Sequence, residues 1–241
     1  MNSEKLFGLN HGVIPACDVN ELFEFENIIK YTHSVEGIVG FKIGFSLALK
    51  YGLNQLSNIA KQYTDLPIIY DHQKAGTDIP QMGEQFAHVC KEGKIKGVII
   101  FPQAGPVTER EFIKALKKND LVPIVGGEMT HQGYLQGEGG FIRNNAPKEM
   151  YKIGAEEGAE YFVVPGNKTE KIKMYRKMLS NIIDCPKFCF PGIGRQGGDI
   201  KIAFEATGDY PAYAIIGSGI YKQSNIEEAA RNYCKEALML E

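Results

Sequence analysis

The sequence predicts an α/β fold, a single (β/α)8 TIM barrel spanning residues 1–241 with its active site at the C-terminal ends of the strands. Short β-branched runs alternate with longer amphipathic stretches, and there are eight of each. The strands are almost continuously apolar, which indicates a parallel sheet covered by helices. No linker, low-complexity tract or charge block divides the chain. An open doubly wound sheet is the structural alternative, and periodicity does not exclude it.

The elements follow one another in strict alternation along the chain. The predicted strands are 11–17, 37–43, 66–71, 96–101, 121–126, 160–165, 187–192 and 212–217. The predicted helices are 20–34, 46–63, 79–93, 108–119, 146–158, 169–181, 199–207 and 225–240. Each helix shows the apolar spacing of one buried face.

Composition narrows the class of protein. A formal net charge of −2 gives no electrostatic reason to expect nucleic acid or an acidic membrane surface as a partner. The N-terminus lacks the plan of a signal peptide, and no apolar run approaches the length of a membrane span. Five cysteines without a CxxC pair suggest free thiols in a reducing compartment. We therefore expect a cytoplasmic protein.

Charged residues gather where the first three strands end. Asp18 follows the first strand, Lys42 lies late in the second, and Asp71 and Lys74 follow the third, with Asp78 just beyond. Neighbouring strand ends share one barrel mouth, so we expect these groups to lie close together. Because carboxylates alternate with lysines among them, each group should keep its neighbours in the charged form. Lys74 is the expected proton donor.

Two of the polar residues near the third strand have alternative roles. Asp78 has the position of a helix N-cap, a purely structural role. His72 is a rival acid–base, but on an extended segment it points away from Asp71.

Two late glycine-rich segments predict an anion site. "PGIGRQGGD" (191–199) exposes backbone N–H groups just before a helix, and "IIGSGIY" (215–221) follows the last strand. Barrels often bind phosphate with the loops after strands seven and eight. Tight turns explain most single glycine loops, but two in these places favour a phosphorylated substrate.

Five segments resemble the orotidine 5′-phosphate decarboxylase family in order and near spacing: "FKIG", "DHQKAGTDIP", "GGEMTHQG", "PGIGRQGGD" and "IIGSGIY". The resemblance runs from about residue 13 to residue 230. It implies a (β/α)8 barrel, a homodimer and no metal or organic cofactor. It also implies conversion of orotidine 5′-monophosphate to UMP and carbon dioxide in pyrimidine biosynthesis.

The resemblance implies a role for each residue of the charged group. Asp18 would contact the ribose hydroxyls, and Lys42 would join the ribose and the charged network. Asp71 would lie beside the substrate carboxylate, and Lys74 would protonate C6.

The resemblance also implies the rest of the site. Asp78 and Ile79 would complete the neighbouring subunit's site. Thr130 stands in place of a serine that contacts the pyrimidine. The nucleotide's phosphate end would meet Pro191, Gln196, Gly217 and Ser218.

The sequence departs from the family pattern twice. The usual Asp-x-Lys-x-x-Asp gains one residue before Lys74 and another after it, so we expect a bulge or turn, helped by Gly76, to restore a common direction. The phosphate-binding arginine after the last strand is replaced by Ser218. Arg195 is the expected substitute cation, and an exposed loop arginine is the alternative.

Two rival functions remain open on the sequence. One is a magnesium-dependent ketose-phosphate decarboxylase or aldolase of the same superfamily, against which "DIP" and the Gln196 loop argue. The other is a catalytically inactive nucleotide-binding homologue, suggested by Ser218 and the stretched spacing.

Overall fold

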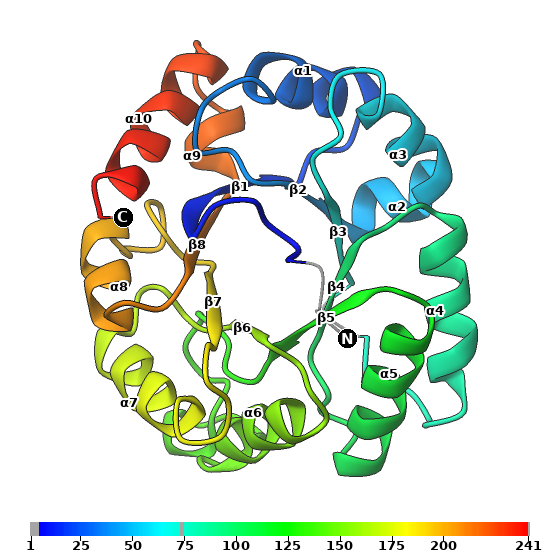
Figure 1. The fold of residues 1–241 in the computed structure, drawn as a ribbon, viewed down its shortest axis with the longest axis vertical. Coiled ribbons are helices and arrows are strands. Elements are labelled where there is room, and N and C mark those ends of the chain that lie inside the picture. The colour runs from blue at the N-terminus through cyan, green and yellow to red at the C-terminus, as the bar shows by residue number, and fades with distance from the viewer. Residues whose placement is uncertain (1–4, 73–74, 241) are drawn as a thin grey trace.

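Eight parallel strands close into a barrel in the computed structural model, which describes residues 5–72 and 75–240. The strands follow sequence order around the ring, and five residues of β8 pair in register with β1 to close it (Figure 1). The strands are β1 (His11–Cys17), β2 (Phe41–Gly44), β3 (Ile68–Asp71), β4 (Gly97–Ile100), β5 (Val122–Gly126), β6 (Tyr161–Val163), β7 (Lys187–Phe190) and β8 (Ala212–Ile216). The predicted barrel is confirmed, and the open doubly wound sheet is wrong.

The helices form the outer ring in Figure 1. They are α1 (Leu22–Thr32), α2 (Phe45–Tyr51), α3 (Leu53–Ala60), α4 (Met82–Glu92), α5 (Pro106–Lys118), α6 (Ala146–Glu156), α7 (Thr169–Leu179), α8 (Ile200–Thr207), α9 (Ser218–Tyr221) and α10 (Ile226–Leu238), with a 3-10 turn at Gln136–Glu138. The helix predicted over 46–63 is instead two helices. Gly52 separates them with φ +79°, a conformation that glycine adopts without steric cost.

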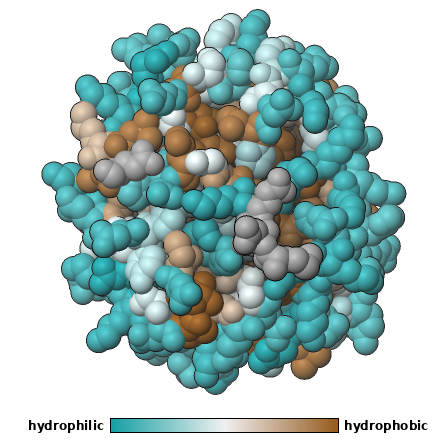
Figure 2. Space-filling view, viewed as in Figure 1, coloured by the Kyte–Doolittle hydropathy of each residue, from teal (hydrophilic) through white to brown (hydrophobic). Residues whose placement is uncertain are grey.

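Side chains alternate between two buried layers along each strand. Ile69, Ile99 and Ile124 point into the barrel, whereas their chain neighbours pack outward against the helices. Burying one such side chain contributes roughly 1.5–3 kcal/mol. On the face shown in Figure 2, hydrophilic side chains dominate the rim, and hydrophobic ones appear mainly further inward.

The segment before β1 closes the N-terminal end of the barrel. In Figure 1 it lies across the ring of strands. Phe7 is fully buried there, with its ring centroid 5.6 Å from that of Tyr161 and 4.5 Å from that of Tyr213. Because aromatic packing fills this end, the C-terminal mouth is where a ligand has room. None of the helices in the described part of the chain is long and apolar enough to cross a membrane.

Candidate active site

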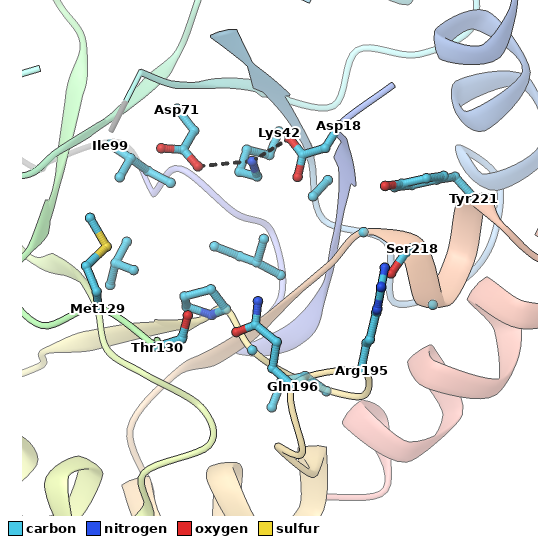
Figure 3. Close-up of a pocket in the computed structure, with 18 of the residues that line it drawn as sticks. Asp18, Lys42, Asp71, Ile99, Met129, Thr130, Arg195, Gln196, Ser218 and Tyr221 are labelled. Atoms are coloured by element: carbon cyan, nitrogen blue, oxygen red, sulfur yellow. Dashed lines mark hydrogen bonds and ion pairs between the residues drawn. The ribbon is translucent and has the colours of Figure 1, made fainter. Parts of the chain in front are cut away.

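A cavity of about 410 Å3 opens at the C-terminal ends of the strands. Its charged end lies at β1 to β3, and its glycine-rich end lies at the exits of β7 and β8 (Figure 3). Thr130 and Met129, after β5, form the wall between them. The fold therefore brings Asp18, Lys42 and Asp71 and the predicted anion-binding residues to one cavity.

Lys42 is the centre of the charged end. It stands in register with Ala16 of β1 and Ile69 of β3, both of which face the barrel interior, so its side chain also points inward. Its Nζ lies 3.0 Å from Asp18 Oδ1 and 3.0 Å from Asp71 Oδ2. Lys42 and Asp71 are buried, whereas Asp18 is half-exposed.

The two carboxylates keep Lys42 protonated. Burial by itself lowers the pKa of this ammonium, but the charges and hydrogen bonds of Asp71 and Asp18 raise the pKa above its ordinary range. Gly44 makes the arrangement possible, because a Cβ at this position would lie 2.6 Å from Asp18 Oδ1. The result is a fixed cation between two anions, aimed into the cavity.

Two members of the predicted charged group lie beyond β3. Lys74 lies outside the described residues. Asp78 and Ile79 are exposed on the segment before α4 and do not line the cavity. Asp78 Oδ1 accepts a hydrogen bond from the Ile79 N–H at 2.7 Å. The alternative that Asp78 caps the next helix is wrong, since α4 begins at Met82 with Gln81 as its N-cap.

His72 points away from the site, as expected. Its Nδ1 shares a hydrogen bond of 2.6 Å with the Tyr70 hydroxyl, and its ring packs near Phe86 of α4. No bulge interrupts β3, because its four residues pair in continuous register with β2, and three of them do so with β4. The extra residues of the stretched motif therefore come after the strand, where the Ala75 N–H donates to the His72 carbonyl across a turn and Gly76 takes φ +85°. That this turn gives Asp71 and Lys74 a common direction stays a prediction, because Lys74 lies outside the described residues.

The other end of the cavity carries a cation and glycine-rich backbone. Arg195 and Gln196 line it from the loop after β7, as do Gly217 and Ser218 after β8. In Figure 3 Arg195 extends toward Ser218. In the part of the chain that the structure describes, Arg195 has no ion-pair partner, which leaves its guanidinium available to an anionic ligand.

Gly192 and Asn167 connect the loop that carries Gln196 to Thr130. Pro191, which also lines the cavity, is followed by Gly192 with φ +87°, and a Cβ there would lie 2.9 Å from Thr130 Cγ2. The Asn167 amide donates to the carbonyls of both Thr130 and Gln196, at 3.4 and 3.3 Å. The two walls of the cavity are thereby joined.

Tyr221 is a site residue that the sequence reasoning missed. It belongs to the four-residue helix α9, and its ring projects into the cavity with its hydroxyl toward Asp18 (Figure 3). Burial, together with the nearby Asp18 charge, raises its pKa, and Arg195 and Lys42 oppose the shift. The sequence signal that could have found Tyr221 was its place at the end of the glycine-rich segment 215–221, four residues after Gly217.

Glu128 is a second residue that was missed. It follows β5, its side chain is fully buried, and it meets Lys168 Nζ at 2.9 Å and Lys171 Nζ at 3.4 Å. It also accepts a hydrogen bond from the Tyr175 hydroxyl. The sequence signal that could have found Glu128 was a charged residue directly after an apolar strand.

Apolar side chains complete the cavity wall: Ile99, Phe101, Met129, Val163 and Ile215.

Within residues 5–72 and 75–240, no three His, Cys, Asp or Glu side chains are arranged to hold a metal ion. The cavity thus combines a buried Asp–Lys–Asp group, an apolar wall and a cationic glycine-rich end. Such a site suits a ligand with an anionic group at one end and a reacting centre, about which charge changes, at the other.

Known proteins of similar sequence cover nearly the whole of this chain. Orotidine 5′-phosphate decarboxylase of Pyrococcus horikoshii is 30% identical over 221 residues, covering 91% of this chain and 95% of that protein. The enzyme of the same name from Pyrococcus abyssi is 29% identical, covering 93% and 98%.

Solved structures share the fold. The crystal structure of the Pyrococcus horikoshii enzyme matches with a TM-score of 0.77 at 28% identity, covering 94% of this chain and 99% of that one. Orotidine 5′-monophosphate decarboxylase of Methanocaldococcus jannaschii complexed with the inhibitor BMP matches with a TM-score of 0.80 at 23% identity, covering 94% and 98%. The model of one family matches residues 12–233. This chain belongs to the orotidine 5′-phosphate decarboxylase / HUMPS family.

Proposed function

We propose that this protein converts orotidine 5′-monophosphate to UMP and carbon dioxide in pyrimidine biosynthesis. The family to which the chain belongs supports this assignment, as do relatives that are named orotidine 5′-phosphate decarboxylase. The observation that carries it is the buried Lys42 between Asp18 and Asp71, in a cavity whose other end offers Arg195. We further propose that the whole chain works as a single domain in the cytoplasm, without metal, organic cofactor, nucleic acid or membrane.

The chemistry requires stabilisation of negative charge on carbon. Loss of carbon dioxide leaves a carbanion at C6, and preorganised charges in a water-poor cavity stabilise such a centre. In this proposal Lys74 supplies the nearest cation and then the proton, with Lys42, Asp71 and Asp78 completing the charged network. The Asp71 carboxylate favours departure of the substrate carboxylate beside it.

The remaining contacts orient the nucleotide. Arg195 and Gln196 bind the phosphate, with backbone at Pro191, Gly217 and Ser218 around it. Thr130 contacts the pyrimidine, and Asp18 contacts the ribose. The separation of the phosphate end from the charged end within one cavity supports this placement. Binding energy from the phosphate then helps to hold the base against the reacting groups.

The active form in this proposal is a homodimer in which Asp78 and Ile79 complete the partner's site. Four hydrophobic side chains at the exits of the adjacent strands β2, β3 and β4 support it. Phe45, Leu49, Ile79 and Val107 are each at least 58% exposed. Phe45 and Leu49 lie in α2, Val107 lies in α5, and Ile79 lies just before α4. Large apolar side chains at this exposure are typical of a protein–protein contact.

The direct test is the ultraviolet absorbance change on mixing purified protein with orotidine 5′-monophosphate and EDTA. We expect rapid turnover that Lys74→Ala abolishes and that Lys173→Ala, at an exposed position on α7, leaves unchanged. Binding of UMP without turnover would identify an inactive nucleotide-binding protein. Turnover of a ketose phosphate that needs magnesium, with none of orotidine 5′-monophosphate, would identify the other rival.

A further inference from the structure

The loop between β3 and α4 rests on the corner between β4 and α5, here defined as residues 101–108. The Phe101 N–H donates to the carbonyl of Ala75 at 2.8 Å. Gly76 packs so closely on Pro102 that a Cβ added to Gly76 would lie 3.1 Å from the Pro102 Cα. The Thr108 hydroxyl donates to the carbonyl of Asp78 at 2.9 Å. Three successive contacts thus run along the loop.

These contacts come where this chain departs from the usual motif spacing. Ala75 N–H also donates to the carbonyl of His72 at 3.0 Å, the spacing of a tight turn. Gly76 then takes φ +85°, a backbone conformation in which other residues are strained. From Ala75 to Asp78 the chain is therefore guided by contacts with the corner rather than by β3.

Thr108 is the rigid member of its contact. It lies in the first turn of α5, is 4% exposed, and belongs to a helix whose Phe112 and Ile113 are buried in the packed layers. Asp78 lies on an exposed segment. Since Thr108 is held in a packed helix and Asp78 is exposed, the hydroxyl sets the position of the Asp78 main chain.

We infer that Thr108 is a positioning residue, which acts through Asp78 to place its carboxylate for the reaction. The inference rests on the proposed role of Asp78 in the charged network. Through the hydroxyl–carbonyl bond, α5 fixes the peptide of Asp78, and the Ile79 N–H holds the carboxylate. The packing of Gly76 on Pro102 fixes the position of the chain just before the Thr108–Asp78 hydrogen bond.

The test is a double-mutant cycle. Thr108→Val keeps the shape and removes the hydroxyl, and Thr108→Ser keeps the hydroxyl. Because a small misplacement can cost up to about 100-fold, we expect Thr108→Val to lower kcat by roughly 10-fold or more with KM little changed. Thr108→Ser should retain most of the activity. In the Asp78→Asn background, Thr108→Val should change kcat less than about 2-fold.

A matched control separates positioning from general packing. Thr32→Val removes another buried hydroxyl, which donates to the Ile28 carbonyl at 2.6 Å in α1, far along the chain from Asp78. It should leave kcat unchanged in both backgrounds. A second variant, Gly76→Ala, should also lower kcat and lose its effect in the Asp78→Asn background.

The outcomes are distinct. An equal loss from Thr108→Val with and without Asp78, or no recovery in Thr108→Ser, overturns the inference. No loss in Asp78→Asn overturns both the role of Asp78 and the inference. If the wild-type protein does not decarboxylate orotidine 5′-monophosphate, the proposed function fails, and amide hydrogen exchange decides whether Thr108 positions the Asp78 segment. Faster exchange over 76–79 in Thr108→Val than in Thr108→Ser supports it, and equal exchange overturns it.

Discussion

Glu109 makes the stability of this protein depend on pH in a direction that can be measured. Its side chain lies in the first turn of α5, the residue is 1% exposed, and its Oε1 has no hydrogen-bond partner among the described residues. Burial raises its pKa from 4.5 to about 9; Arg110 opposes the shift and Glu157 adds to it. The folded protein therefore holds this carboxyl protonated at neutral pH.

The size of the effect follows from the difference in pKa. The stability that this group contributes is complete below about pH 4.5 and is lost as the pH rises to about 9, because only the unfolded chain releases the proton in that window. Each pH unit costs about 1.4 kcal/mol, so between pH 5 and pH 8 the free energy of unfolding falls by about 4 kcal/mol on account of Glu109.

Glu109→Gln removes the titration and keeps the shape. Urea unfolding at several pH values should show that the variant loses about 4 kcal/mol less than the wild-type protein between pH 5 and pH 8. A constant offset from the buried amide does not affect this difference. Glu111→Gln, on the same helix but half-exposed and paired with Lys114, should follow the wild-type pH dependence. Parallel curves for the wild-type protein and Glu109→Gln would refute the reasoning.

Three further predictions concern the site and the assembly. Asp71→Asn leaves buried Lys42 with only the half-exposed Asp18, so urea unfolding should show a loss of about 3 kcal/mol and turnover should fall steeply. Arg195→Ala should raise KM for orotidine 5′-monophosphate by roughly 10- to 100-fold, the value of a lost charged hydrogen bond, and an unchanged KM would make it an exposed loop arginine. Phe45→Glu should shift a dimer to monomers in sedimentation, with loss of turnover; an intact, active dimer would place the interface elsewhere.

The fold was readable from the sequence because a parallel barrel repeats one local rule. Each strand must be apolar on both faces, and each helix on one, so the alternation appears in the residues themselves. The rule says less about where helices break. Gly52 divides one predicted helix, and the short α9 depends on contacts after β8 rather than on its own four residues.

The site was readable in part for a related reason. A charged side chain at the end of an apolar strand stands out, and Asp18, Lys42 and Asp71 were found in this way. Tyr221 and Glu128 were missed because a tyrosine and a glutamate are ordinary in helices and loops. Only tertiary packing places the Tyr221 ring in the cavity and buries Glu128 beside lysines.

The sequence by itself determined the alternation of buried parallel strands with helices and the strand ends at which the chemistry gathers, because period and polarity are local properties of the chain. Closure of the sheet into a barrel rests on the pairing of β8 with β1, which only the tertiary structure shows. The tertiary structure alone decided which charges meet. Lys42 reaches both Asp18 and Asp71 only because three strands lie side by side in one register. Likewise, Thr108 meets Asp78 across 30 residues of chain because α5 packs beside the loop. Contacts between distant residues depend on how elements pack in three dimensions, and no local pattern in the chain encodes them.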